Sequence, residues 1–170
     1  FRNVTGVQTC ALPIFYLLPL KITNTRKKIM HQENLLGTMR SEVTSLGIQE
    51  VKTANEIDEI LKDQKGTLFL FVNSVCGCSA GSARPSLRIA LKNSVLPQKF
   101  VTVFAGQDRE ATAQARKYIT EFPPSSPSMF LFRDGKVVHA IERWQIEGRS
   151  PQMIAEHLME AFNEYCEVPA

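Results

Sequence analysis

The chain has 170 residues, of which 44% are hydrophobic and 22% charged, with nine Gly and nine Pro. This composition is typical of one soluble globular domain and excludes a disordered chain, a collagen-like chain and a repeat array. Four cysteines are too few for a disulfide-dense secreted scaffold. The net charge is +3, but residues 1–29 hold five basic residues and no acidic one, and subtracting these five charges leaves −2 for residues 30–170. We therefore expect no nucleic acid partner.

The first 29 residues differ in character from the rest. The apolar run 11–20 is only ten residues long and is broken by two prolines, whereas a membrane-spanning helix needs about 20 residues. Most of the basic residues follow this run, whereas a secretory signal carries them before it. Residues 2–14 resemble the translation of a DNA sequencing adapter. We therefore expect residues 1–29 to be a non-native leader, with Met30 as the natural start and residues 30–170 as the domain, and we expect no membrane partner.

The hydrophobic pattern of residues 30–170 predicts an α/β fold. The predicted elements, in chain order, are a helix over 32–46, a strand over 48–52, a helix opened by a capping box at 53–56, a strand over 67–72, a helix over 79–95 bent at Pro85, a strand over 100–104, a helix over 108–119, strands over 128–132 and 136–141, and a last helix opened by Ser150 and Pro151.

The order of these elements predicts the sheet. The continuous apolar run 67–72 indicates a central strand that is buried on both faces. Right-handed crossovers make the first three strands parallel, and a hairpin at Asp134–Gly135 adds two more strands. We therefore expect a mixed sheet with helices on both faces and one extra helix at the N-terminus.

Two cysteines stand where the central strand passes into the next helix. Cys76 follows the strand and Cys78 begins the helix, within the small, polar stretch 73–82. A thiolate at a helix N-terminus faces unpaired N–H groups and the positive end of the helix dipole, so its pKa falls and it becomes a nucleophile. Gly77 gives the backbone freedom that closing so tight a disulfide needs. A strained disulfide of this kind is more oxidising than a relaxed Cys-x-x-Cys pair.

Two other interpretations of the pair stay open. The cysteines could be inert and buried, or they could bind a metal. A structural zinc site needs four donors, and the other candidate donors are scattered singly along the chain: Cys166, His31, His139 and His157. We therefore expect no metal site and no organic cofactor. A metal or iron–sulfur carrier that uses the pair from two subunits of a dimer is the alternative from another functional class.

Four motifs resemble the bacterial bacilliredoxin family, of the A/B type. The resemblance covers essentially all of residues 30–170 and is carried by Asn73–Pro85, Val103–Thr112, Pro124–Met129 and Ile146–Gly148. It implies a thioredoxin-like fold and a cytoplasmic thiol oxidoreductase, a monomer or a homodimer. Such an enzyme removes bacillithiol, a small cysteine-bearing sugar conjugate, from client proteins that carry it as a mixed disulfide. Bacillithiol would then be the co-substrate.

The resemblance also assigns roles to the cysteine motif. It implies that Cys76 is the attacking cysteine and Cys78 its partner, with Gly77 between them at the substrate. Ser79 stands where the family often has Ala. A protein disulfide isomerase or a general thiol oxidoreductase is the second interpretation, because a Cys-x-Cys potential also suits disulfide shuffling.

Four further residues are candidates for a role at the site. The resemblance aligns Pro127 with the cis-proline beside the active cysteine of thioredoxin-like proteins, where Ser126 would offer its backbone to the substrate, and an ordinary trans turn is the other interpretation. Arg84 would stabilise the thiolate or bind the carboxylates of bacillithiol, although an exposed helix arginine is the simpler interpretation. Cys166 is similar to a third cysteine of family members, and a packed free thiol explains it equally well.

Overall fold

The computed structural model describes residues 20–167 of the chain, and the side chains of residues 28–167. The chain divides into two compact units, Phe1–Leu35 and Leu36–Ala170. The first 19 residues of the expected leader lie outside the described residues. Its last ten belong to the first helix, which begins at Leu20 and also contains most of the helix expected over 32–46. That residues 1–29 are a leader stays a prediction.

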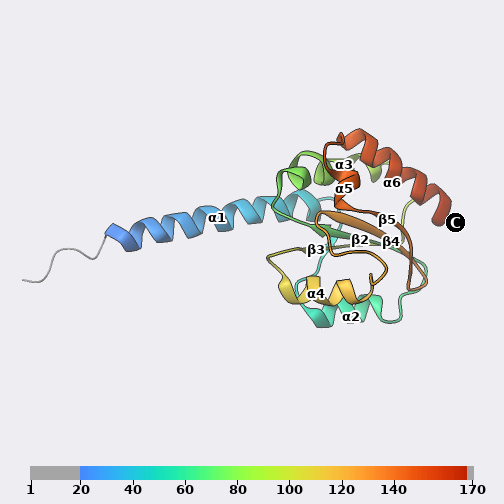
Figure 1. The fold of residues 1–170 in the computed structure, drawn as a ribbon, viewed down its shortest axis with the longest axis horizontal. Coiled ribbons are helices and arrows are strands. Elements are labelled where there is room, and N and C mark those ends of the chain that lie inside the picture. The colour runs from blue at the N-terminus through green and yellow to red at the C-terminus, as the bar shows by residue number, and fades with distance from the viewer. Residues whose placement is uncertain (1–19, 168–170) are drawn as a thin grey trace, which may run out of the picture. The chain divides into compact units, whose positions relative to one another are not determined.

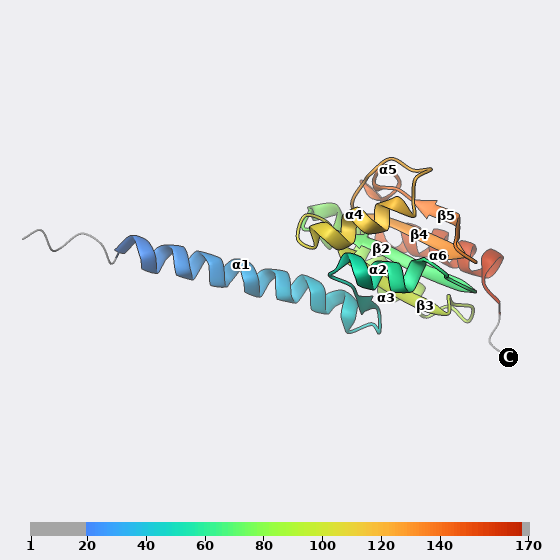
Figure 2. The same cartoon turned by 90° about the horizontal axis from the view of Figure 1, so that it is seen from below.

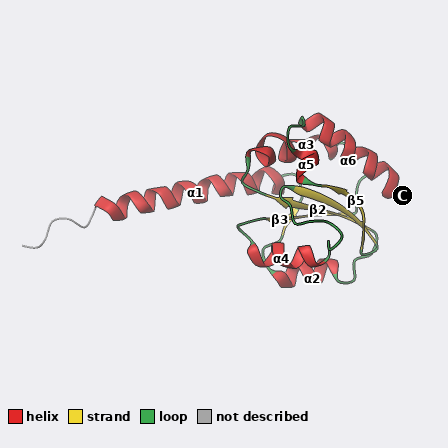
Figure 3. Ribbon diagram, viewed as in Figure 1, coloured by secondary structure: helices red, strands yellow, loops and turns green. Residues whose placement is uncertain are grey.

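The remaining elements follow the predicted order (Figures 1 and 3). The helices are α1 (Leu20–Thr44), α2 (Ala54–Leu61), the π-helical segment η1 (Ser79–Ala83), α3 (Arg84–Ala90), α4 (Arg109–Lys117), α5 (Arg143–Ile146) and α6 (Pro151–Tyr165). The strands are β1 (Gln49–Glu50), β2 (Thr67–Asn73), β3 (Lys99–Phe104), β4 (Ser128–Arg133) and β5 (Lys136–Ile141). The sequence pattern missed only the single-turn helix α5.

The predicted mixed sheet is confirmed. Its strand order is β1-β3-β2-β4-β5. Strands β1 and β2 each pair with β3 in parallel, whereas β4 runs antiparallel to both β2 and β5. The β4–β5 hairpin turns at Asp134 and Gly135, which have φ angles of 50° and 79°. Positive φ at both central residues is typical of the tight hairpin turns that Asp-Gly favours. Strand β2 is therefore the central strand, as expected.

Strand β2 separates two apolar layers. All seven of its residues are buried, and their side chains alternate between the two faces of the sheet. Phe69 and Phe71 pack in one layer with residues of α3 and α6, and Leu68 and Leu70 pack in the other with residues of α2 and α4. Figures 1 and 2 show these helix pairs on opposite sides of the sheet. A strand buried in this way holds the cysteine loop that follows it on a rigid base.

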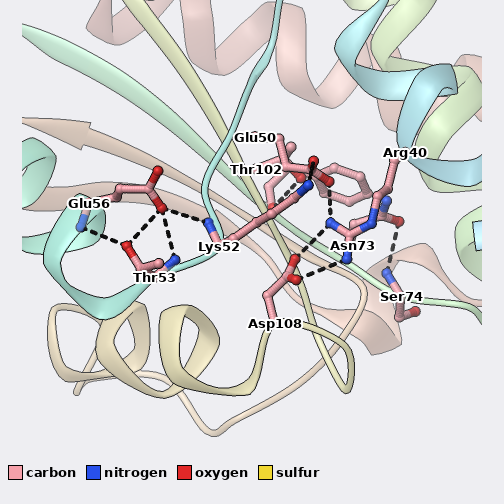
Figure 4. A network of polar contacts seen from close by, with 10 residues as sticks. Arg40, Glu50, Lys52, Thr53, Glu56, Asn73, Ser74, Thr102 and Asp108 are labelled. Carbon is pink, nitrogen blue, oxygen red and sulfur yellow. Dashed lines mark hydrogen bonds and ion pairs between the residues drawn. The ribbon is translucent and has the colours of Figure 1, made fainter. Parts of the chain in front are cut away.

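Local capping explains where α2 begins, whereas the start of α4 is held by a salt-bridge network. Thr53 and Glu56 form the predicted capping box of α2, with the Thr53 N–H donating to the Glu56 carboxylate at 2.9 Å (Figure 4). Asp108, at the start of α4, makes no capping bond. Its carboxylate instead accepts two hydrogen bonds from Arg40, at 2.8 and 2.9 Å, and Arg40 also pairs with Glu50. This network ties the end of α1 to β1 and to the start of α4 (Figure 4).

The helix that follows β2 differs from its predicted bounds. Helical backbone begins at Gly77, two residues earlier than expected, and ends at Ala90 rather than Val95. The early end has a local cause, since the side chain of Asn93 donates to the carbonyl of Val95 and stabilises a turn. The π-helical stretch η1 ends two residues before Pro85, which lies in the first turn of α3. The bend expected at Pro85 stays a prediction.

None of the helices within residues 20–167 is long and apolar enough to cross a membrane.

Candidate active site

Cys76 caps the helix that leaves the central strand. Its carbonyl accepts hydrogen bonds from the N–H groups of Ser79 and Ala80, both at 3.1 Å. Its Sγ accepts a further bond from the Ser79 N–H at 3.4 Å, which is the geometry of an N-cap side chain. The sulfur therefore takes the place that a Ser or Asp oxygen usually fills, at the positive end of the helix dipole.

The hydrogen-bond donors around Cys76 favour its thiolate. Partial burial of the thiol opposes a charge there, but it is outweighed by the Cys78 thiol, the Ser74 hydroxyl at 3.1 Å from Sγ, and the Ser79 N–H. Together these donors lower the pKa of Cys76 below its ordinary value of 9.0. Cys76 remains partly exposed as a residue, which is compatible with attack on a substrate.

Cys78 has the opposite tendency. Burial raises the pKa of its thiol, and so do its hydrogen bond to Cys76 and the charge on the Cys76 sulfur. Its side chain packs against the apolar layer that contains α3 and α6. The pair is therefore asymmetric, with a thiolate favoured at Cys76 and a neutral thiol favoured at Cys78. Both cysteines are free in this structure.

A buried polar network supports the loop from below. The side-chain oxygen of Asn73 accepts from the Ser74 N–H at 2.8 Å, which Figure 4 shows, and from the Ser79 hydroxyl at 2.7 Å. Ser74 and Ser79 are the two residues that donate to the Cys76 sulfur. Asn73 therefore fixes both donors from the last residue of β2. The small, polar character of residues 73–82 predicted a site here, and this network explains that character.

Arg84 belongs to the same network and is not the exposed helix arginine that the sequence favoured. Its side chain is 2% exposed and pairs with Glu42 of α1 at 2.5 Å. It also donates to the carbonyl of Ser74 at 3.1 Å and to the hydroxyl of Ser79 at 3.3 Å. Because its donors point into the protein, Arg84 supports the loop and is not placed to bind a ligand carboxylate. The interpretation as an exposed arginine is therefore wrong, and the role in substrate binding stays a prediction that this burial does not favour.

The other predicted residues border the same end of the sheet. Ser128, the first residue of β4, pairs with Val72, so Ser126 and Pro127 lie at the edge where β2 leads into the cysteine loop. The Ser126–Pro127 peptide bond is cis, as the resemblance implied. Gly77 is exposed and has no positive φ in this dithiol form. The backbone freedom expected of it is therefore not used while both cysteines are reduced.

Sequence reasoning missed Arg143. This residue begins α5 and its guanidinium acts electrostatically on both cysteines, favouring the thiolate at each. Nothing in the pattern around it marked it, because α5 is a single turn that lies 67 positions after Cys76 in the chain. The neighbouring Trp144 is 66% exposed.

The remaining cysteine and histidines do not join the pair. Cys166 is 8% exposed at the end of α6, and burial raises the pKa of its thiol. His139 and His157 face each other with ring centroids 4.8 Å apart, between β5 and α6. Within the described part of the chain, no three His, Cys, Asp or Glu side chains converge as metal donors.

The chain is similar to known proteins over most of its length. A family model described as "Disulphide isomerase" matches residues 31–166. A bacilliredoxin of Koribacter versatilis (strain Ellin345) is 47% identical over 137 residues, which cover 81% of this chain and 94% of that protein. A bacilliredoxin of Staphylococcus aureus (strain NCTC 8325 / PS 47) is 46% identical over 138 residues, with the same coverage of both chains.

Solved structures of thioredoxins are similar in arrangement and distant in sequence. The thioredoxin of Fasciola hepatica is 20% identical, has a TM-score of 0.49, and matches 69% of this chain and 99% of its own. The oxidised thioredoxin of Plasmodium falciparum is 17% identical, has a TM-score of 0.48, and matches 68% of this chain and 98% of its own.

The site and the family matches agree on the class of chemistry. Two neighbouring thiols with opposite ionisation tendencies stand at the N-terminus of a helix that follows the central strand of a mixed sheet, and relatives that are 46% and 47% identical carry the same family name. The protein is a thiol–disulfide oxidoreductase, and its chain belongs to the bacilliredoxin family.

Proposed function

We propose that this protein removes bacillithiol from client proteins that carry it as a mixed disulfide. The observation that carries the proposal is the asymmetry of the pair, with the Cys76 thiolate favoured and Cys78 kept as a thiol that donates to it. A nucleophile and a resolving thiol are the two groups that such a reaction needs. The bacilliredoxin name of relatives that are 46% and 47% identical supports bacillithiol as the thiol.

In the first step, the Cys76 thiolate attacks the bacillithiol sulfur of the mixed disulfide. A bond forms between the Cys76 sulfur and the bacillithiol sulfur, and the bond between the bacillithiol sulfur and the client sulfur breaks. The client cysteine leaves as a thiolate and takes up a proton from the solvent. Cys76 then carries the bacillithiol, so one mixed disulfide has replaced another.

In the second step, Cys78 or a second bacillithiol resolves the intermediate. If Cys78 loses its proton and attacks the Cys76 sulfur, bacillithiol leaves as a thiolate and the pair becomes a disulfide. Two electrons have then passed from the pair to the client, so an external thiol must reduce the pair before the next cycle. If a second bacillithiol attacks instead, bacillithiol disulfide leaves and the Cys76 thiolate is restored directly.

A competition experiment tests the proposed substrate. The reduced protein is mixed with a client carrying bacillithiol and, separately, with the same client carrying glutathione, and the products are followed by mass spectrometry. We expect faster release of the bacillithiolated client and an adduct of one bacillithiol on Cys76. Equal rates for the two clients would contradict the assignment to bacillithiol.

Disulfide isomerisation is the second candidate, favoured by the description of the matching family model. An isomerase restores activity to a scrambled protein that contains no bacillithiol, because its thiolate attacks protein disulfides directly. Refolding of a scrambled multi-disulfide protein distinguishes the two functions. Removal of bacillithiol without refolding activity would exclude the isomerase function.

The proposal includes the compartment and the cofactor. We propose a cytoplasmic enzyme, because the resemblance to the bacilliredoxin family implies this compartment and because reduced thiols persist in a reducing compartment. Bacillithiol is then the only co-substrate, with clients as partners. The metal or iron–sulfur carrier predicts a coloured or metal-containing protein, so absorption spectra and metal analysis of the purified protein decide that alternative.

A further inference from the structure

We propose that Arg143 is a binding subsite for a carboxylate of the thiol that Cys76 accepts from its substrate. This inference rests on the proposed function, because it concerns the substrate of the same site. It assigns to Arg143 the anion-binding role that the sequence gave to Arg84. The chemical class of ligand is an anionic low-molecular-weight thiol in disulfide linkage.

The charge of Arg143 is directed at the thiol pair. Among the groups that act most strongly on the thiols of Cys76 and Cys78, Arg143 carries a full positive charge. A cation beside the attacked sulfur would attract an anionic disulfide and would also favour the thiolate. Arg143 can therefore act on both partners of the reaction.

Helix α5 holds Arg143 in a defined place. The N–H of Glu142 donates to the side chain of Gln145 at 2.9 Å, which completes a capping box around this single turn. Ile146 is fully buried in the layer against which Cys78 packs. The hydroxyl of Ser82, in the helix that carries the thiols, donates to the Arg149 carbonyl at 2.7 Å. The start of α5 is thus fixed relative to the cysteine helix.

The guanidinium of Arg143 remains available to a ligand. Its side chain is 47% exposed, and its ion pair with Glu147 spans 3.4 Å on the surface. Exposed pairs of this kind contribute little free energy, so a ligand carboxylate can compete for the guanidinium. Arg84 differs in both respects, since it is buried and its donors are already bound to the loop.

Exposed apolar side chains flank the same place. In residues 36–167 the exposed large hydrophobic side chains are Val75, Trp144 and Met153. Val75 directly precedes Cys76, and Trp144 directly follows Arg143. Arginine and tryptophan are enriched among residues that dominate binding, and exposed apolar groups mark binding surfaces. Val75 and Trp144 would therefore border a ligand whose carboxylate contacts Arg143.

A set of small symmetric disulfides of different charge tests the subsite directly. The full chain is reacted with 3,3′-dithiodipropionate, which is anionic, with bis(2-hydroxyethyl) disulfide, which is neutral, and with cystamine, which is cationic. All three are attacked by the same thiolate, so the ratio of their rates cancels any change in the pKa of Cys76. For Arg143→Gln we expect the anionic-to-neutral ratio to fall about two- to fivefold and the cationic-to-neutral ratio to rise.

Two variants serve as controls. Arg143→Lys keeps the charge, so it should retain most of the anionic preference. Arg149→Gln removes an exposed charge from the same segment that is not among the groups acting most strongly on either thiol, so its ratios should stay close to the wild-type ratios. An unchanged ratio in Arg143→Gln would overturn the inference, and so would an equal fall in Arg149→Gln.

A second measurement identifies the owner of the carboxylate. One client is prepared with bacillithiol and, separately, with 2-mercaptoethanol as a neutral mixed disulfide. If the carboxylate belongs to bacillithiol, Arg143→Gln slows the first reaction more than the second, because the loss of a charge that favours the Cys76 thiolate slows both reactions equally. Equal slowing of both would overturn the inference, because Arg143 would then not distinguish the bacillithiol group from the neutral one. A different result would contradict the proposed function, namely equal rates for the clients that carry bacillithiol and glutathione, which are both anionic.

Discussion

Cys76 and Cys166 occupy opposite ends of two helices. Cys76 caps the N-terminus of the helix that leaves β2, and Cys166 follows the last turn of α6 as its C-cap. The N–H groups and the positive dipole end face Cys76, whereas the negative dipole end faces Cys166. Both thiols are partly or wholly removed from water, yet the pKa of Cys76 is lowered and that of Cys166 is raised.

The difference between the two thiols comes from the number of donors that face the sulfur. Burial raises the pKa of Cys166, and the Thr67 side chain and the charge of Arg133 only partly offset it. At Cys76, three donors exceed the effect of burial. Reactivity is therefore a property of the position in the fold, and the following substitutions test that statement.

Loss of the attacking sulfur should have the largest effect. We expect Cys76→Ser to abolish the removal of bacillithiol, with a loss of at least about a thousandfold in rate, because a serine hydroxyl is not ionised near neutral pH. Cys78→Ser should keep the first step and accumulate a mixed disulfide on Cys76. Intact-protein mass spectrometry after a single turnover checks both variants. Retention of the first step in Cys76→Ser and its loss in Cys78→Ser would show that the two roles are reversed.

The pH dependence of alkylation should separate the two thiols. Only thiolates react with iodoacetamide, so each rate rises as the pH passes through the pKa of that thiol. The rate for Cys76 should rise at a pH below the ordinary value of 9.0, and that for Cys166 above it. We expect a difference of more than about tenfold at pH 7. Peptide mapping of the alkylated protein gives the pH profile of each thiol. Coincident profiles would refute the predicted pKa difference between Cys76 and Cys166.

Removal of one hydrogen-bond donor to the Cys76 sulfur should narrow the pKa difference between Cys76 and Cys166. Ser74→Ala deletes the hydroxyl that donates to the Cys76 sulfur at 3.1 Å, which should shift the pKa of Cys76 upward and slow its alkylation at pH 7 about three- to tenfold. Ser94→Ala is the matched control, because Ser94 is an exposed serine in the segment that follows α3. Similar alkylation rates in the two variants would show that Ser74 does not stabilise the thiolate.

Substitution of Cys166 should have the smallest effect on activity. Cys166→Ala removes a buried sulfur at the edge of the apolar layer, so we expect a loss of about 1 kcal/mol in the free energy of unfolding. The rate of bacillithiol removal should stay within about twofold of the wild-type rate. Urea unfolding and the client assay measure the two quantities. A large loss of activity in a stably folded Cys166→Ala protein would assign a redox role to this cysteine.

The parts of the fold that depend on residues close together in the sequence could be predicted from the sequence. The apolar run of β2 reports its own burial, and the Asp134–Gly135 turn reports its own φ angles. The position of the cysteines after a strand and before a helix was visible for the same reason. The network around the site was not visible, because Arg84 is buried by partners as distant in sequence as Glu42. Likewise, Arg143 reaches the site only through the packing of α5.

The π-helical stretch η1 determines which way the start of its helix faces. Its hydrogen bond from the Arg84 N–H to the Ser79 carbonyl spans one residue more than an α-helical bond. One extra residue in a helix rotates the residues that precede it by about 100° around the helix axis. As a result, Ser79 is buried and Ala80 is exposed, whereas regular α-helical spacing back from Ala83, Arg84 and Leu87 would turn Ala80 inward. The single added residue thus sets the angular position from which the cysteine motif meets its substrate.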